Sequence, residues 1–264
     1  MAPAIAPSLC RDDSLPAQAA LPEPHGVPLL AAEWRDLVML SFEIDPRVLA
    51  PHVPAGTELD RWHGAAFVSV VGFQFTHARL FGVRIPLYGN FEEVNLRFYV
   101  RRRVVDGWHR GVVFLRELVP KRAVAWVASA FGENFRQAPM TRQIDRDRPG
   151  DAPRRIEYQW RLAGRAQRLA LETAAGTPTL PESGSLDEFI VEHYWAYTAL
   201  PRGRAREHFV VHPPWHIASA TRASLEADVG ELYGDRFAPF LSRRPESAFW
   251  ADGSLVRAYR GARP

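Results

Sequence analysis

The chain has 264 residues, of which 47% are hydrophobic, 11% aromatic and 24% charged. This composition excludes a disordered chain, a coiled coil and a collagen-like fibre, and a chain of this length can bury a large core. The net charge is only +3, and 30 acidic residues are interspersed with 33 basic ones. We therefore expect no nucleic-acid partner.

The first 30 residues are rich in alanine and proline, which predicts a flexible N-terminal extension followed by a single domain over residues 31–264. No apolar run is long enough to cross a membrane, so we expect no membrane partner. Cys10 is the only cysteine, which excludes an intramolecular disulfide and a thiolate metal site. The sequence therefore indicates a cytoplasmic protein, and a homo-oligomer is compatible with it.

The first predicted elements after the extension are strands. The apolar run at residues 37–42 predicts a strand, and Asp45 followed by Pro46 predicts the start of a short helix that ends by His52. Residues 67–75 are apolar at successive positions, which predicts a central strand covered on both faces.

Residues 91–100 predict a strand with one apolar and one polar face. The apolar face carries Val94, Leu96, Phe98 and Val100, and the other carries Glu93, Asn95, Arg97 and Tyr99. A further strand is expected at 112–118 and a helix at 120–131. Residues 141–153 are charged and contain Pro and Gly, which predicts a loop.

The second half of the chain also predicts mainly strands. A hairpin is expected from residues 156–162 and 167–173, and strands are expected at 206–211 and 215–220. Ser185 and Glu188 form a capping box for a helix with an apolar stripe extending to Tyr197. Asp252-Gly253 is typical of a hairpin turn. These elements predict one α+β, mostly antiparallel, barrel-like domain with a few short helices.

Lys121 is the first candidate for chemistry because it is the only lysine in the chain. With Pro120 and Arg122 it opens the predicted helix, where the helix dipole and the neighbouring arginine both disfavour an ammonium group. A lowered pKa would make Lys121 a nucleophile for Schiff-base formation, as in acetoacetate decarboxylase. The alternative is that codon bias has left one solvated lysine on an exposed helix start.

The polar strand face at Glu93, Asn95 and Arg97 is the second candidate. In a barrel with an internal ligand site, these side chains would provide an acid/base group, a hydrogen-bonding amide and an anion clamp. A solvent-facing strand with a surface salt bridge is the alternative, because antiparallel sheets commonly leave one face in water.

The histidines give no metal site. His212 and His216 are separated by two prolines, which prevent the helix that would bring both rings to one face. His193 lies beside the apolar stripe of its helix, which favours a packed residue bonded through one ring nitrogen, with Glu192 nearby in the sequence. We expect no metal and no other cofactor.

Several segments resemble the YqjF-like family, which is also called domain of unknown function 2071 and is grouped with the acetoacetate decarboxylase-like superfamily. They are Trp34 to Leu37, Phe91 to Arg97, Gly111 to Phe114, Glu192 to Trp195 and Ala251 to Ser254. The resemblance covers about residues 30–261 and implies a curled, mostly antiparallel β-barrel with a central cavity.

The decarboxylases themselves are similar at three places. Arg35 stands where their active-site arginine is expected, Lys121 where their Schiff-base lysine is expected, and Glu93 or Glu92 near their active-site glutamate. Arg122 replaces a second lysine of the decarboxylases. Within the matching segments, the resemblance makes Glu117 and Tyr194 further candidates for substrate binding, together with Asn95 and Arg97.

Two functions follow as hypotheses. The first is a lyase, either a decarboxylase or an aldolase-dehydratase, that acts on a small oxo-acid through an imine at Lys121. Arg122 would depress the pKa of Lys121, Glu93 would transfer protons, and Arg35 or Arg97 would hold a carboxylate. The second is a barrel that binds a small molecule without converting it.

Overall fold

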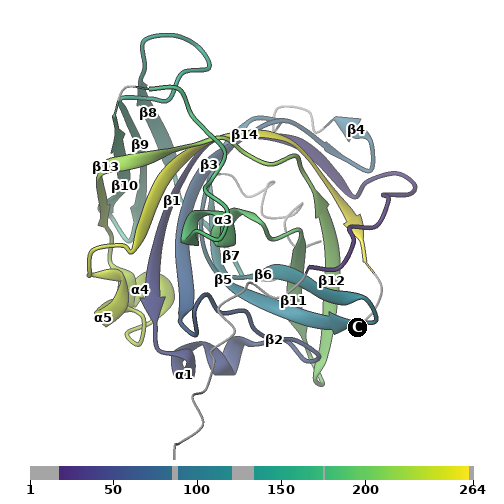
Figure 1. The fold of residues 1–264 in the computed structure, drawn as a ribbon. Helices are drawn as coiled ribbons and strands as arrows, with labels where there is room; N and C mark the ends of the chain where they lie inside the picture. The colour runs from purple at the N-terminus through teal and green to yellow at the C-terminus, as the bar shows by residue number, and fades with distance from the viewer. Residues whose placement is uncertain (1–17, 85–88, 121–133, 175, 262–264) are drawn as a thin grey trace, which may run out of the picture.

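The computed structural model describes residues 18–84, 89–120, 134–174 and 176–261. Long strands dominate it, and they form one large sheet that curls around a central space (Figure 1). The strands are β1 (Leu30–Ile44), β2 (Glu58–Leu59), β3 (Ala66–Leu80), β4 (Val83–Arg84), β5 (Phe91–Val104), β6 (Gly107–Val119), β7 (Phe135–Gln137), β8 (Met140–Asp145), β9 (Arg155–Leu162), β10 (Arg165–Thr173), β11 (Trp195–Leu200), β12 (Arg204–Val211), β13 (Ile217–Glu226) and β14 (Ser247–Arg260).

The helices that the structure describes are all short. They are α1 (Pro46–Leu49), the 3-10 turn η1 (Ala50–His52), α3 (Leu186–Val191), α4 (Val229–Tyr233) and α5 (Ala238–Leu241). None of these has the length and apolar character needed to cross a bilayer. The predicted helix over 120–131 lies outside the described residues except for Pro120, as do the first 17 residues of the predicted extension.

The sheet closes on itself through its first and last described strands. Its order runs β1-β3-β5-β6-β11-β12-β14, and β14 also pairs with β1. Most neighbours are antiparallel, but β6 pairs with β11 and with β7 in parallel, so the sheet is mixed. From β14 the sheet also continues in another direction, through β13, β10 and β9 to β8. We call these four strands the second arm. The mostly antiparallel α+β fold is therefore confirmed, as a curled mixed sheet.

Two apolar cores lie on opposite faces of the curled sheet. Strand β5 shows the division: Val94, Leu96 and Phe98 belong to the core that also contains Tyr158 and Trp160 of β9. The other core contains Phe73, Tyr99 and Phe189, so it lies on the side of β5 that carries the polar residues. Side chains of a strand alternate between faces, so each face of β5 meets a different core.

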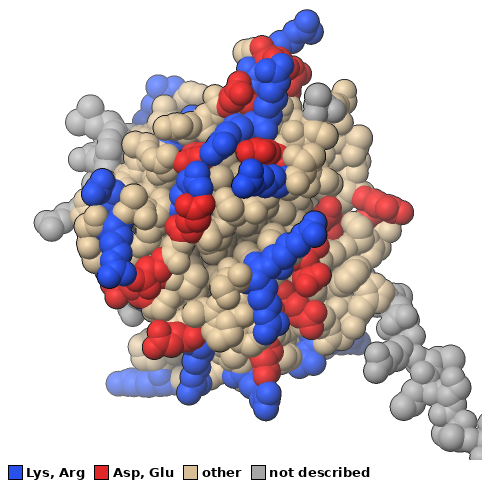
Figure 2. Space-filling model, turned by 90° about the vertical axis from the view of Figure 1, so that its left-hand side faces the viewer, with Lys and Arg blue, Asp and Glu red and all other residues tan. Residues whose placement is uncertain are grey.

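The second arm carries charges of both signs on its outer face. Figure 2 shows acidic and basic side chains intermixed over the side of the molecule where this arm lies. Cross-strand ion pairs such as Arg155 with Glu172 and Arg168 with Glu226 join neighbouring strands there. Exposed pairs of this kind each contribute about 0–1 kcal/mol to stability.

Most predicted elements are confirmed. The strands expected at residues 37–42, 67–75, 91–100, 112–118 and 156–162 all form, and each is longer than predicted. Helix α1 begins as expected, because the Asp45 carboxylate accepts a hydrogen bond of 2.9 Å from the backbone N–H of Arg47. An N-cap of this type satisfies one of the free N–H groups of the first turn.

Two predictions about the middle of the chain are wrong. Residues 141–145 belong to strand β8 and not to a loop, because they pair with β9 along their whole length. Helix α3 ends at Val191, well before Tyr197, because the backbone N–H of Tyr194 bonds to the carbonyl of Arg110 and draws the chain alongside β6. Helices α4 and α5 were not predicted.

The predicted hairpin at Asp252-Gly253 is also wrong, since β14 runs straight through it and pairs with β1 on both sides. Gly253 has a φ of +76°, and a Cβ at this position would lie 2.0 Å from the carbonyl oxygen of Trp34. Glycine is needed here because the backbone of β1 approaches too closely for any side chain.

Replacing Gly253 with alanine should therefore destabilise the fold by about 2 kcal/mol, through backbone strain and the clash with Trp34. Urea unfolding monitored by circular dichroism would measure this. Gly164→Ala is the matched control, because Gly164 also has a positive φ of +79° but open space around it. That variant should lose only about 1 kcal/mol, and an equal loss in both variants would contradict the close approach.

Candidate active site

A cavity of about 110 Å³ lies inside the curl of the sheet. Its described lining is mainly apolar and aromatic, and it includes Trp34, Phe73, Phe75, Phe91, Phe114 and Trp215. The polar side chains in the lining include Glu93, Asn95, Arg97, Glu117, His193 and His212. An apolar cavity with a few convergent polar groups is the usual form of a small-molecule site.

The polar face of β5 points into this cavity. Glu93, Asn95 and Arg97 are between 2% and 7% exposed, so this face is not turned to solvent. Of the two alternatives that the sequence leaves open, the geometry matches the internal site. A bulge between β5 and β6, at Leu96 and Arg97, also brings Phe114 and Glu117 of β6 into the lining.

Glu93 and Glu117 form a pair of buried carboxyl groups on adjacent strands. The Oε1 atom of Glu93 accepts a hydrogen bond of 2.9 Å from the Asn95 side-chain amide. Burial nevertheless raises the pKa of Glu93 to about 7. Burial and the neighbouring Glu93 charge raise the pKa of Glu117 well above its usual value. A negative charge on one carboxyl group disfavours a negative charge on the other, so the pair keeps a proton near neutral pH.

Arg97 is a buried cation for which the described residues provide no carboxylate partner. Its Nη2 atom lies 3.6 Å from the sulfur of Met39, and its buried Nε atom has no hydrogen-bond partner among the described residues. The guanidinium also lies 5.8 Å from the ring centre of Tyr99. A buried, unpaired charge is costly for the fold, and it provides strong donors to an anion that enters the cavity.

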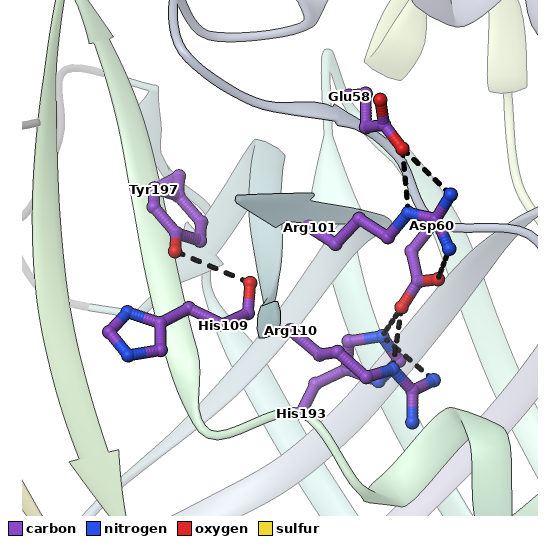
Figure 3. A network of polar contacts seen from close by, with 7 residues as sticks. All are labelled: Glu58, Asp60, Arg101, His109, Arg110, His193 and Tyr197. Carbon is purple, nitrogen blue, oxygen red and sulfur yellow. Dashed lines mark hydrogen bonds and ion pairs between the residues drawn. The ribbon is translucent and has the colours of Figure 1, made fainter. Parts of the chain in front are cut away.

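A second polar cluster connects the cavity to the surface (Figure 3). Asp60, from the loop after β2, accepts hydrogen bonds at its Oδ2 atom from Arg110 Nε at 2.7 Å and from His193 Nε2 at 3.1 Å. Its Oδ1 atom lies 4.0 Å from Arg101 Nη1, and Arg101 pairs at 2.7 Å with Glu58. His193 comes from the turn after α3 and lines the cavity.

The charges in this cluster fix the protonation of its members. Burial alone would raise the pKa of Asp60, but its contacts with His193 and Arg110 lower it to about 2. Burial and the positive charge of Arg110 lower the pKa of His193 to about 4, despite the opposing effect of Asp60. At neutral pH Asp60 is therefore an anion and His193 is a neutral imidazole.

His212 is a second neutral histidine in the lining. Burial lowers its pKa to about 4, and its ring stacks between Tyr194 and Trp215 with ring centres 4.6 and 4.2 Å apart. Its Nδ1 atom donates to the carbonyl of Pro213 at 2.9 Å. In the part of the chain that the structure describes, no three His, Cys, Asp or Glu side chains come together to hold a metal ion.

The predicted site residues divide into three groups. Glu93, Asn95, Arg97 and Glu117 share the cavity. Arg35, Glu92 and Tyr194 are not among the side chains that line it. Lys121 and Arg122 lie outside the described residues.

A bulge explains why Arg35 is not in the lining. Strand β1 shifts register between Arg35 and Val38, and Asp36 has a φ of +56°. Trp34 and Leu37 consequently both reach the cavity, although they are three residues apart. The side chain of Arg35 is half-exposed and bonds to the carboxylate of Glu33 at 3.0 Å.

Glu92 and Tyr194 are the other two predicted site residues outside the lining. Glu92 follows the alternation of β5 and belongs to the face opposite Glu93. The hydroxyl of Tyr194 donates to Glu192 at 2.9 Å.

His193 bonds to Asp60 and not to Glu192, because the turn after α3 points the ring toward the β2 loop. Asp60 itself was missed, since no local pattern reveals a partner 133 positions away.

Comparison with known proteins agrees with this architecture. Residues 31–254 match the model of the DUF2071 family, which is described as an uncharacterized conserved protein. The chain belongs to this family. The chain is also similar to the Uncharacterized protein YqjF of Bacillus subtilis (strain 168), which is 27% identical over 215 residues, 80% of this chain and 84% of that protein. The predicted YqjF-like membership is confirmed.

Two solved structures have a fold similar to that of this chain. An acetoacetate decarboxylase-like enzyme from Sphingomonas wittichii RW1 aligns with a TM-score of 0.62 at 14% identity, covering 90% of this chain and 94% of that one. The enduracididine biosynthesis enzyme MppR aligns with a TM-score of 0.61 at 15% identity, covering 89% of both chains. That MppR structure contains the condensation product of pyruvate and imidazole 4-carboxaldehyde. The acetoacetate decarboxylase-like fold is thus confirmed.

Proposed function

We propose that the cavity binds a small oxo-acid and that Lys121 forms an imine with it, so that the protein acts as a Schiff-base lyase. The observation that carries this proposal is the guanidinium of Arg97. It is buried in an apolar cavity, and it pairs with no carboxylate among the described residues. Proteins bury charges where they are paired, so a bound carboxylate would complete this site.

Arg97 would hold the substrate by its carboxylate. Hydrogen bonds between two charged groups are about twice as strong as neutral ones, and burial strengthens them further. The side-chain oxygen of Asn95 is buried and has no described partner, so this amide can also orient the ligand. The aromatic walls would exclude water from the rest of the substrate.

Glu93 would transfer protons. With a pKa raised to about 7, it is present in both protonation states at neutral pH, as a general acid or base requires. Glu117 would keep this pKa high by repelling a charge on Glu93. The hydrogen bond from Asn95 fixes the position of the carboxyl group.

Lys121 would supply the nucleophile. It follows β6, the strand that carries Glu117, two residues after Val119, and Arg122 stands beside it. Its amine would attack the ketone carbon, and the carbonyl oxygen would leave as water to give an iminium ion.

The iminium can then act as an electron sink in either of two reactions. In the decarboxylation of a 3-oxo-acid such as acetoacetate, the bond between the carboxylate and the carbon next to the iminium carbon breaks, and its electron pair moves to the iminium nitrogen, which gives carbon dioxide and an enamine. Glu93 then protonates the enamine carbon. In an aldol-dehydratase reaction, Glu93 removes a proton next to the iminium, the enamine adds to an aldehyde, and water is eliminated. Hydrolysis of the imine releases the product and restores Lys121.

Borohydride trapping tests this proposal sharply because Lys121 is the only lysine. Reduction in the presence of pyruvate, 2-oxobutanoate or acetoacetate should add the mass of the reduced ligand, and peptide mapping should place it at Lys121. Lys121→Arg keeps the positive charge and the N-terminal amine, and it should abolish the adduct.

No adduct with any of these acids, or an adduct that survives Lys121→Arg, would contradict imine formation. The second candidate function, a small-molecule-binding protein without catalysis, would then remain. It rests on the same Arg97 cavity, which can hold a carboxylate without any contribution from Lys121.

A further inference from the structure

The imidazole of His193 has one ring nitrogen fixed and the other unused. Its Nε2 atom lies 3.1 Å from Asp60 Oδ2. Its Nδ1 atom is buried and has no hydrogen-bond partner in the described part of the chain. The side chain is 1% exposed and belongs to the cavity lining. A buried nitrogen without a partner costs free energy unless a ligand satisfies it.

The surroundings of His193 determine which nitrogen carries the proton. A neutral imidazole has one N–H and one lone pair. Asp60 is an anion that can only accept, so the Nε2 atom that faces it must be the protonated one. Arg110 does not compete strongly, because its Nη2 atom is 3.5 Å from Nε2 while its Nε atom donates to Asp60 at 2.7 Å. The Nδ1 atom therefore has a lone pair.

Asp60 is itself rigidly held. Figure 3 shows Arg110 and Arg101 on either side of its carboxylate, with Glu58 beyond Arg101. The rings of Tyr99 and Phe189 contact the His193 imidazole, with ring centres 4.7 and 5.1 Å away. The ring can therefore neither flip nor change tautomer without breaking the bond to Asp60, so Nδ1 is a preorganised hydrogen-bond acceptor.

We infer that His193 Nδ1 accepts a hydrogen bond from a hydroxyl group of the ligand whose carboxylate Arg97 holds. This rests on the carboxylate site of the proposed function but not on the imine at Lys121. A neutral hydroxyl fits better than an ammonium group because the positive charges of Arg97 and Arg110 both act on this ring. The ligand class is thus a short carboxylic acid that carries a hydroxyl group. His193 touches the ligand, and Asp60 is a positioning residue.

Butanoate and its 2-, 3- and 4-hydroxy derivatives are suitable probes, because they lack a ketone and cannot form an imine. Isothermal titration calorimetry on the full chain should show that at least one hydroxybutanoate binds about 3- to 10-fold more tightly than butanoate, the worth of one neutral hydrogen bond. Equal affinities for all four acids, or no binding of any of them, would overturn the inference.

His193→Gln removes the Nδ1 acceptor. The amide nitrogen of glutamine can take the place of Nε2 and still donate to Asp60, but glutamine has no atom equivalent to Nδ1. This variant should lose the preference for the hydroxy acid over butanoate. Urea unfolding followed by circular dichroism would show that the variant is folded. A preference that survives His193→Gln would overturn the inference.

Asp60→Asn provides a second test that does not require His193 to be replaced. The asparagine amide can donate to Nε2 and move the ring proton to Nδ1, where it would face the ligand hydroxyl as a donor. Nitrogen-15 NMR of the histidine rings should show this change of tautomer. A wild-type His193 ring with its proton on Nδ1, or a spectrum that Asp60→Asn leaves unchanged, would contradict the assignment of Nδ1 as an acceptor held by Asp60. A missing borohydride adduct alongside an intact preference would instead reject only the imine.

Discussion

Replacing Arg97 with methionine should weaken the binding of short oxo-acids such as pyruvate by about 100-fold and at the same time raise the stability of the fold. The binding loss is expected because the buried guanidinium is the proposed partner of the ligand carboxylate, and removing one member of such a pair costs several kcal/mol. The stability gain is expected because the free protein buries this charge without a described partner. Methionine would pack beside Met39 without a buried charge, so the free energy of unfolding should rise by about 1 kcal/mol or more.

Calorimetric titration and urea unfolding would measure the two effects on the same samples. Arg103→Met is the matched control, because Arg103 is an exposed arginine on the same strand whose guanidinium lies over Trp108. It should leave both binding and stability nearly unchanged. A variant at Arg97 that loses stability and keeps its affinity for oxo-acids would show that the guanidinium serves the fold and not the ligand.

The second large effect concerns the pH dependence of stability at Glu93. Its pKa is raised from 4.5 to about 7 on folding, so the folded protein holds a proton that the unfolded chain releases. The stability that comes from holding this proton is fully present below pH 4.5 and is lost as the pH rises through 7. Glu93→Gln resembles the protonated state at every pH. It should therefore equal the wild type at pH 4 and exceed it by about 3 kcal/mol at pH 8.

The comparison between variant and wild type is needed because other groups titrate in the same range. The pKa values of His193 and His212 are lowered to about 4, so their stabilising effect grows as the pH rises and partly masks that of Glu93. Both proteins contain these histidines, so the difference isolates the carboxyl group. Glu117→Gln should change stability in the same direction. A Glu93→Gln variant with no gain at pH 8 would contradict a protonated buried pair.

The sequence is sufficient to predict the parts of this molecule that depend on local pattern. The alternation along β5 indicates that Glu93, Asn95 and Arg97 share one face, and the structure places them together in one cavity. The Asp45-Pro46 pair predicts the start of α1 correctly, since a cap needs only neighbouring residues. These features follow from side-chain periodicity and turn chemistry, which tertiary contacts rarely override.

The features that were missed depend on long-range contacts. The same dipeptide that forms hairpin turns occurs at Gly253, where the close approach of β1 keeps the strand straight. The position of Arg35 depends on a bulge at Asp36 that no local rule reveals. The role of His193 depends on Asp60, which approaches it only when the β2 loop and the turn after α3 meet.

The pairing of β14 with β1 also bears on how the site forms during synthesis. These strands join residues as far apart as Leu30 and Ala258, and contacts of such large sequence separation form late in folding. Val256 and Ala258 of β14 belong to the wall of the cavity. A nascent chain that lacks β14 would therefore leave Arg97 and the two carboxyl groups in contact with water. Enclosure of these charges therefore depends on the pairing of β14 with β1.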